Sequence, residues 1–298
     1  MILSSHQIES FHKDGFLILD NFFSEIELKR FDSALKKIIN NQLNKAKKKH
    51  RKLEIDFVGK EFDEAIIKLE EVDHQYVADV YDTIYSTAAF LSLSTKKEIT
   101  ECINQLLERE LDDPLYLDQS RCRIDTPFDP YRKKCGWHQE VFYYVPKSDF
   151  VQTWAPLIHH AKKEIGTIEV CVGSHKEIAR QSNEKPDNEK YPYIVEQSEV
   201  KKYNVQIMEL KLGQLLIFNS KLVHRSGDNV SKKVRYSLVG INHNIDNEFF
   251  SPPRFIEVEQ KEKFEIFHKY LNEKRLGSET IPVLKNTAYN NLNWYLKI

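Results

Sequence analysis

The pattern of apolar and polar positions changes about one third of the way along the chain. Behind Ser24, apolar residues recur at the three- and four-residue intervals of an amphipathic helix. Glu27, three residues after Ser24, completes the pattern of a capping box, which indicates a helix start. Similar spacing predicts helices at about 63–92 and 96–110, so residues 1–112 are expected to be mainly helical.

Short runs rich in β-branched and aromatic residues predict strands. One such run, "GFLILDNFF", precedes the first long helix. After Pro114, seven more follow in roughly 130 residues, separated by Gly, Pro, Asn and Asp: "QSRCRI", "HQEVFYYV", "FVQTWAPLI", "TIEVCV", "VQIMELK", "QLLIFN" and "VRYSLVGIN". Regular short strands favour a sandwich or barrel over a doubly wound parallel sheet.

We expect a single domain over residues 1–298, mainly β with helical additions. The chain has 298 residues, of which 41% are hydrophobic, so it can bury one large core. Its β-rich part spans 113–250 and contains a polar stretch, 176–204, too long for a plain hairpin, which we interpret as an insertion or lid. A last helix, at about 258–274, is predicted within a C-terminal part, 251–298.

Charge and cysteine content exclude several classes of protein. Lys and Arg total 44 against 45 Asp and Glu, which argues against nucleic acid as the partner. The basic run 45–52, "KAKKKHRK", is interpreted as a solvated helix end. The four cysteines show no CxxC spacing, which favours reduced thiols and a cytoplasmic protein. Neither a signal peptide nor a run of eighteen apolar residues is evident, so no membrane partner is expected.

The stretch "GWHQEVFYY" places an imidazole and a carboxylate two residues apart in a predicted strand. Residues i and i+2 of a strand point to the same face, so His138 and Glu140 could chelate one ion while Gln139 points away. Such pairs are common, and a local polar contact is an equally simple explanation. The pair by itself leaves both interpretations open.

A second motif lies near the end of the β-rich part. His224 follows an apolar run, and a turn at 227–229 leads to a strand that carries Arg235. If the two segments fold back on each other, both side chains line one cavity. Two histidines and one carboxylate leave positions open on a metal, which suits non-haem Fe(II) that binds a cosubstrate and O2. A buried arginine nearby would pair with a carboxylate of that cosubstrate.

The ordered series of motifs resembles the phytanoyl-CoA dioxygenase family of Fe(II)/2-oxoglutarate-dependent oxygenases. The series is "FHKDGFLILDNFFS", "GWHQE", "TWAPL", "GSHK" and "HRSGDNVSKKVRYSL". The resemblance implies a double-stranded β-helix, or jelly roll, packed by N-terminal helices. It also implies an enzyme that uses Fe(II), 2-oxoglutarate and O2, forms succinate, and hydroxylates a small-molecule or carrier-bound metabolite.

Residue by residue, the resemblance assigns His138, Glu140 and His224 as the iron ligands and catalytic centre. Arg235, eleven positions past His224, falls on the 2-oxoglutarate arginine, and Ser226 falls on a hydroxyl that assists it. An aromatic residue near the cosubstrate corresponds to Trp154.

Other polar residues are candidates for binding cosubstrate or substrate. Arg121 and Arg123, on the strand before the metal pair, could hold the cosubstrate or an anionic substrate, or could equally form salt bridges. Tyr144 shares the parity of His138 and Glu140 and is therefore a pocket candidate.

Three positions depart from the family pattern. Glu140 stands where the family usually has Asp, and its extra methylene would need a slightly retracted backbone. Arg225 stands where Gly usually follows the distal histidine, and could approach an anionic substrate. "VGSH" lacks the usual proline, and we expect its His175 to be structural. Because a carboxylate ligand is retained, hydroxylation is favoured over halogenation.

Two alternatives stay open. A non-redox, cupin-like protein could hold a structural metal ion, and a degenerate homologue could act as a binding module. Arg235 favours the oxygenase, because a structural metal site has no need of a carboxylate clamp. We expect His159 and His160, which precede a polar loop, to lie at the surface.

Overall fold

Two antiparallel sheets form the centre of the molecule. The computed structural model describes residues 1–50, 62–127, 136–142, 150–182, 194–248 and 250, so the predicted C-terminal helix and tail lie outside the described residues. The larger sheet has the order β1-β6-β3-β8-β2 and the smaller one β5-β4-β7. The strands are β1 (Phe16–Leu19), β2 (Leu115–Asp125), β3 (Phe150–Pro156), β4 (Ile168–Cys171), β5 (Val205–Ile207), β6 (Leu215–Asn219), β7 (His224–Ser226) and β8 (Arg235–Asn244).

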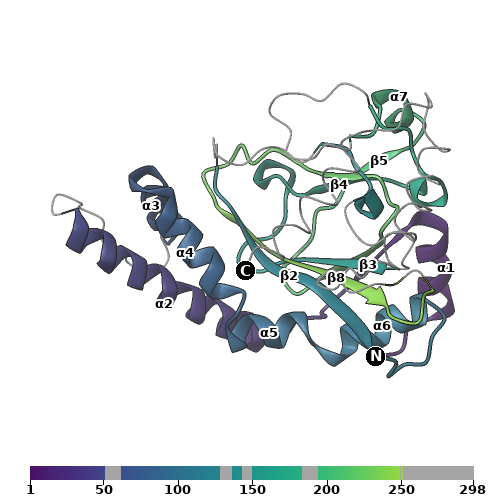
Figure 1. Cartoon of the computed structure of the whole chain (residues 1–298), viewed down its shortest axis with the longest axis horizontal. Coiled ribbons are helices and arrows are strands. Elements are labelled where there is room, and N and C mark those ends of the chain that lie inside the picture. Colours follow the sequence, from purple (N-terminus) through teal and green to yellow (C-terminus); the bar gives the residue numbers. More distant parts are fainter. Residues whose placement is uncertain (51–61, 128–135, 143–149, 183–193, 249, 251–298) are drawn as a thin grey trace, which may run out of the picture.

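Helices cover one face of the larger sheet, and the smaller sheet lies over the other (Figure 1). The helices α2, α3 and α4 pack against one another and extend beyond the strands. The helices are α1 (Ser5–Asp14), α2 (Glu25–Lys49), α3 (Phe62–Val72), α4 (His74–Ile84), α5 (Ala88–Ser94), α6 (Lys97–Leu106) and α7 (Gln197–Val200).

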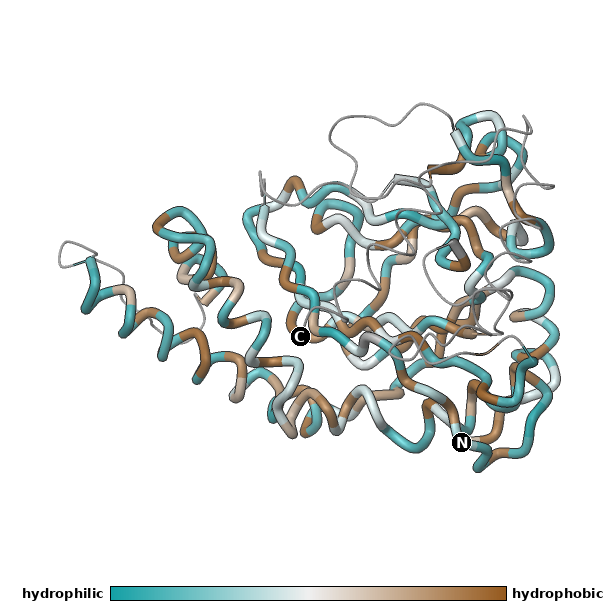
Figure 2. The backbone as a smooth tube through the Cα atoms, viewed as in Figure 1, coloured by the Kyte–Doolittle hydropathy of each residue, from teal (hydrophilic) through white to brown (hydrophobic). Residues whose placement is uncertain are grey.

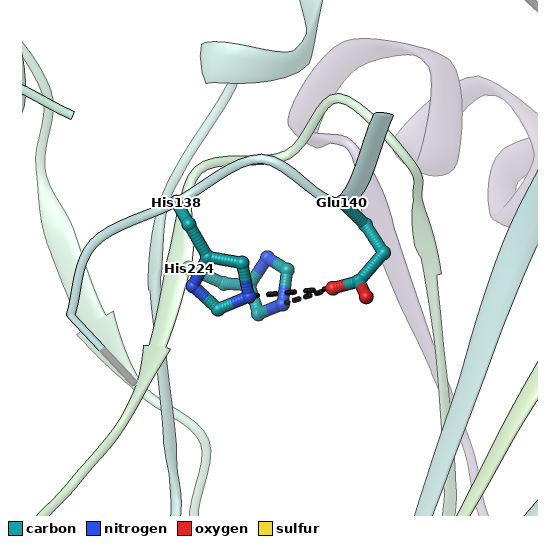
Figure 3. A group of neighbouring side chains, drawn as sticks. All are labelled: His138, Glu140 and His224. Carbon is teal, nitrogen blue, oxygen red and sulfur yellow. Dashed lines mark hydrogen bonds and ion pairs between the residues drawn. The ribbon is translucent and has the colours of Figure 1, made fainter. Parts of the chain in front are cut away.

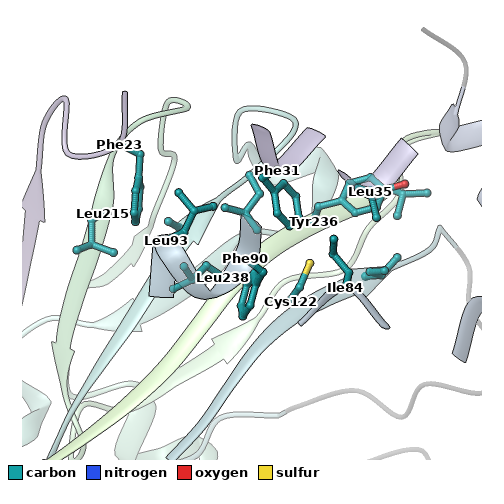
Figure 4. Packing of buried hydrophobic residues seen from close by; sticks show 14 of the residues in the cluster. Phe23, Phe31, Leu35, Ile84, Phe90, Leu93, Cys122, Leu215, Tyr236 and Leu238 are labelled. Atoms are coloured by element: carbon teal, nitrogen blue, oxygen red, sulfur yellow. The ribbon is translucent and has the colours of Figure 1, made fainter. Parts of the chain in front are cut away.

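The alternation of side chains along β8 separates two interiors. Tyr236 and Leu238 point toward the helices, where they meet Phe31 of α2 and Phe90 of α5 (Figure 4). The opposite face of the larger sheet packs against β4 through a second apolar cluster, made by Trp154, Ile168, Val170, Leu216, Phe218 and others. The jelly-roll prediction is confirmed, with helices on the outer face of the larger sheet.

The predicted N-terminal helices are present, with additional breaks. Ser24 and Glu27 form the predicted capping box at the start of α2, and brown and teal residues alternate along this helix in Figure 2. The described part of the basic run, residues 45–50, forms the C-terminal end of α2, whose last helical residue is Lys49. The single helix predicted at 63–92 is instead three helices, because Asp73 and Thr87 cap new starts.

Six of the seven strands predicted after Pro114 are present, and the exception is the segment that carries His138 and Glu140. "HQEVFYYV" was expected to be a strand, but His138 makes one isolated bridge and Glu140–Phe142 is a 3-10 helix. Tyr144 and its neighbours 143–149 lie outside the described residues. No described helix is both long and apolar enough to cross a bilayer.

The cap of α2 makes stability depend on pH. Burial acts to raise the pKa of Glu27, but bonds from the Lys96 ammonium and the Ser24 hydroxyl and amide outweigh it and lower the pKa to about 2. A depressed pKa contributes stability above the ordinary value of 4.5, and this contribution is lost as pH falls through about 2. We expect Glu27→Gln to lower the free energy of unfolding at pH 7 and to flatten its decline below pH 4.5.

Urea unfolding monitored by circular dichroism across this pH range measures the effect. Glu25→Gln is the matched control, because Glu25 pairs with Lys29 while its side chain is 81% exposed. Equal effects of the two variants would contradict the assignment to the cap.

Candidate metal site

Two segments meet at the β7 edge of the smaller sheet. The backbones of His138 and His224 exchange two hydrogen bonds, each 3.0 Å long. On its other edge His224 pairs with Val170 of β4, so His138 is a single-residue continuation of the smaller sheet. The Val141 amide donates to the Ser220 carbonyl at 3.2 Å, which keeps the 3-10 turn against the same segment.

His138, Glu140 and His224 form a buried group that could hold a metal ion (Figure 3). One ligand atom from each lies within 4.8 Å of the others. Glu140 Oε2 is 3.3 Å from His138 Nε2 and 3.6 Å from His224 Nε2. The 3-10 turn that begins at Glu140 replaces the predicted strand.

Backbone carbonyls select the tautomer of both histidines. Nδ1 of His138 is 2.7 Å from the Gly136 carbonyl, and Nδ1 of His224 is 2.8 Å from the Leu222 carbonyl. Because a carbonyl only accepts, each Nδ1 carries the proton and each Nε2 presents a lone pair to the group. Phe218 packs edge-on against the His224 ring, with centroids 4.9 Å apart.

The ionisation states suit a cation. Burial lowers the pKa of His224 to about 4, and the neighbouring His138 acts in the same direction, so the imidazole is neutral at neutral pH. Burial acts to raise the pKa of Glu140, but its contacts with His138, His224 and Arg123 outweigh this, and the pKa is lowered. A carboxylate and a neutral imidazole are the forms in which these side chains bind metals.

A second charged group lies on the inter-sheet face of β2 and β8. Arg235 Nε and Nη2 donate to Asp125 Oδ2 at 3.0 and 2.8 Å, and Arg123 Nη2 donates to Asp125 Oδ1 at 3.0 Å. Arg235 is buried, and its Nη1 has no hydrogen-bond partner among the residues that the structure describes. A buried donor without an acceptor is costly, which indicates that this side of the guanidinium is open to an anionic ligand.

The remaining predicted cosubstrate residues lie nearby in the fold. Trp154 points between the sheets, in the apolar cluster with Leu216 and Phe218. Ser226 is two residues after His224 on β7 and so shares its face. Arg121 is exposed and shares a face of β2 with Arg123. Their roles in binding stay predictions.

Arg225 has partners other than a substrate. It lies on the opposite face of β7 from His224. Its Nε and Nη2 donate to Glu169 Oε2 at 2.9 and 2.7 Å, and its guanidinium lies 4.7 Å from the centroid of the Trp137 ring. This geometry counts against the predicted approach of Arg225 to the substrate.

The other histidines lie apart from the metal group. His175 is buried, as expected for a structural residue, and its Nε2 is 3.1 Å from the His12 carbonyl. Gly15 leaves room for this ring, because a Cβ there would lie 2.5 Å from Nδ1. The His159 side chain is 24% exposed, which agrees with the surface prediction, and its Nε2 lies 2.7 Å from Asp63 Oδ2. His160 accepts from the Leu212 amide at an exposed position.

Sequence reasoning missed two residues that contact the predicted site. Asp125 bonds both Arg123 and Arg235, and the alternation Arg123-x-Asp125 on a predicted strand was a usable signal. Gln139 is fully buried between the two ligands of its segment. No periodic signal marks it, because its partners are backbone atoms distant in the sequence.

A family model described as phytanoyl-CoA dioxygenase matches residues 11–237, which is more than half of the chain. The chain belongs to the phytanoyl-CoA dioxygenase family. This family membership, predicted from the order of the motifs, is thereby confirmed and supports a dioxygenase-type function. A comparison with curated protein sequences gives no significant match.

Solved structures of this fold are similar over most of the chain. They include EctD from S. alaskensis, crystallised with 2-oxoglutarate and 5-hydroxyectoine (TM-score 0.55, 17% identity, 84% of this chain and 79% of that chain). The epimerase SnoN, crystallised with Fe3+, α-ketoglutarate and nogalamycin RO, has a TM-score of 0.54 at 14% identity (80% and 82%). EvdO2 from Micromonospora carbonacea var. aurantiaca, complexed with 2-oxoglutarate, has a TM-score of 0.52 at 16% identity (85% and 95%). At these identities the likeness shows the fold.

The three ligand atoms make a direct prediction about metal binding. We expect Glu140→Ala to weaken Co(II) binding by at least 100-fold, since it removes the anionic ligand. Glu140→Asp should weaken binding less, by about tenfold, because the shorter side chain starts from an unchanged backbone.

Titration of the Co(II) visible absorption measures both affinities. Glu199→Ala is the control, because Glu199 is a buried carboxylate that pairs with Lys202 instead. Binding by Glu140→Ala with wild-type affinity would exclude this carboxylate as a ligand.

Proposed function

We propose that the protein is an Fe(II)- and 2-oxoglutarate-dependent dioxygenase that hydroxylates a small-molecule or carrier-bound substrate. The observation that carries the proposal is the occurrence, in one jelly-roll core, of a buried His-Glu-His group and a buried arginine whose Nη1 finds no partner in the described part of the chain. The first suits an iron that needs open coordination positions. The second suits the distal carboxylate of 2-oxoglutarate.

The donor set fits iron. Two imidazole nitrogens and one carboxylate are supplied by His138, His224 and Glu140, whose side chains are all at least 90% buried. Hydrogen bonds to the Gly136 and Leu222 carbonyls hold both rings in orientation without a metal. Three protein ligands leave the remaining positions of an octahedral metal for cosubstrate and O2.

The arginine cluster, formed by Arg123, Asp125 and Arg235, fits a carboxylate. A guanidinium has two forks, and Asp125 occupies the one formed by Nε and Nη2 of Arg235. The end formed by Nη1 and Nη2 stays available for a second carboxylate. The two guanidinium groups and the Asp125 carboxylate have a net charge of one positive unit. Fe(II) together with the Glu140 carboxylate would also have a net charge of one positive unit. A dianion such as 2-oxoglutarate would therefore neutralise the two groups together.

Each residue then has a physical role. When bound, Fe(II) and 2-oxoglutarate supply the oxidising chemistry, in which O2 is consumed, 2-oxoglutarate becomes succinate and CO2, and the substrate is oxidised. Arg235 orients the distal carboxylate, and Asp125 holds the guanidinium in position. Trp154, Phe218 and the apolar residues around them exclude water from the space between the sheets.

Three observations support the reaction type and the substrate class. A carboxylate ligand is retained, which favours hydroxylation over halogenation, although an epimerase shares this fold. The exposed Arg121 lies two residues before Arg123 on the same face of β2, which favours a substrate with an anionic group. The solved relatives EctD and SnoN were crystallised with small molecules, which agrees with this class.

The proposal predicts a spectroscopic signal. Anaerobic addition of Fe(II) and 2-oxoglutarate to the protein should produce the weak visible charge-transfer band of a metal-chelated 2-oxo acid. Omission of either component should abolish the band. A protein that binds Fe(II) but gives no band at saturating 2-oxoglutarate would be a non-redox metal protein instead.

Arg235 provides a second prediction. We expect Arg235→Ala to weaken 2-oxoglutarate binding by at least 30-fold, because it removes a charge-assisted bidentate contact, while Co(II) affinity changes less than threefold. Isothermal titration calorimetry of the Co(II)-loaded protein measures the former.

The control for Arg235 is Arg109→Ala. The Arg109 side chain is 7% exposed and pairs with Asp113 and Asp246 outside the arginine cluster, so its loss tests the general cost of removing a buried arginine. Parallel losses of metal and cosubstrate binding in Arg235→Ala would make Arg235 a folding residue.

A further inference from the structure

The segment 137–140, called the metal segment below, has two faces with different partners. His138 and Glu140 face the metal group, whereas Trp137 and Gln139 point into the protein behind it. Gln139 has no exposed surface at all. A buried amide must be hydrogen-bonded, so its partners show what the back of the segment is attached to.

The Gln139 side chain makes three hydrogen bonds, all to backbone atoms. Its Nε2 donates to the Glu177 carbonyl at 2.9 Å and to the Lys221 carbonyl at 2.5 Å. Its Oε1 accepts from the Ala179 amide at 2.9 Å. Both amide hydrogens are used, so the group is satisfied only while all the segments keep their relative positions.

One of these bonds joins the two halves of the metal group. Lys221 lies three residues before His224, so the Lys221 carbonyl belongs to the segment that delivers the third ligand. Gln139 lies between the other two ligands. Together with the backbone bonds of His138 and Val141, it holds the separation between the ligand pair and His224.

The other two bonds attach the start of the 176–204 stretch. Trp137 strengthens this attachment, because its carbonyl accepts from the Val195 amide at 2.7 Å. Its ring packs in a cluster with Ala179, Val195 and Val200. The described parts of the stretch therefore pack against the back of the metal segment.

We propose that Gln139 is a positioning residue that sets the spacing of the three metal ligands before a metal binds. The inference rests on the proposed metal function of His138, Glu140 and His224. A metal needs all three ligand atoms at once, and two of them come from a segment different from the third. If only the backbone bonds of His138 and Val141 join these segments, metal binding must complete their ordering, which lowers the affinity.

The test compares two buried amides with the same kind of contacts. Gln139→Met keeps the length of the side chain but removes all three bonds. Asn104→Leu is the matched control, because Asn104 is also fully buried, donates to the carbonyls of Leu111 and Asp113, and accepts from Arg109. Each variant removes the amide donor of two backbone carbonyls, but only Gln139 lies behind the metal group.

We expect similar falls in Tm for the two variants and different metal affinities. Gln139→Met should weaken Co(II) binding by 10- to 100-fold and alter its visible absorption, whereas Asn104→Leu should change the affinity less than twofold. Hydrogen exchange of the metal-free protein gives an independent readout. Protection of the Ala179 amide should be lost in Gln139→Met and kept in Asn104→Leu.

A shorter variant keeps the test valid if Gln139→Met does not fold. Gln139→Asn retains an amide that cannot span both carbonyls, so it should also weaken Co(II) binding. Folded Gln139 variants that bind Co(II) with wild-type affinity would overturn the inference alone. A wild-type protein that binds no Co(II) or Fe(II) would overturn the metal site itself, and the inference with it.

Discussion

The reciprocal backbone hydrogen bonds between His138 and His224 are the contact on which the site depends. They place two segments that lie far apart in the sequence at bonding distance, and the side chains follow from that placement. Burying two imidazoles and a carboxylate in an apolar core is unfavourable unless each polar atom has a partner. Here the Gly136 and Leu222 carbonyls accept hydrogen bonds from the two Nδ1 atoms, while Glu140 faces both Nε2 atoms.

The division of the larger sheet into two faces makes that burial possible. The helices α2 and α5 cover the outer face with a continuous apolar cluster, which provides most of the hydrophobic stabilisation. The inner face is therefore free to carry polar groups between its apolar residues. Arg123, Asp125 and Arg235 lie there as a charged cluster whose members compensate one another except at Arg235 Nη1.

Several features of the fold were predictable because they depend on local chemistry. The capping box at Ser24 and the spacing of apolar residues in α2 are properties of adjacent residues, and both were confirmed. Breaks within the predicted helix 63–92 were missed, because the caps at Asp73 and Thr87 compete with a continuing apolar period. The strand predicted at 138–145 failed over its described part for a different reason. Its aromatic and β-branched residues favour a strand, but the neighbouring segment offers His138 only one bridge.

The sequence alone determined which residues could bind a metal and the family to which the chain belongs, because ligand chemistry and motif order are written in residue types. Tertiary structure decided how those residues are used. Arg225 follows the predicted metal ligand His224 in the sequence, yet strand alternation turns it to the opposite face, where it contacts Glu169 and Trp137. Asp125 bonds Arg235, 110 residues away, and Gln139 bonds the Lys221 carbonyl, 82 residues away. Contacts at that separation exist only once the chain has folded.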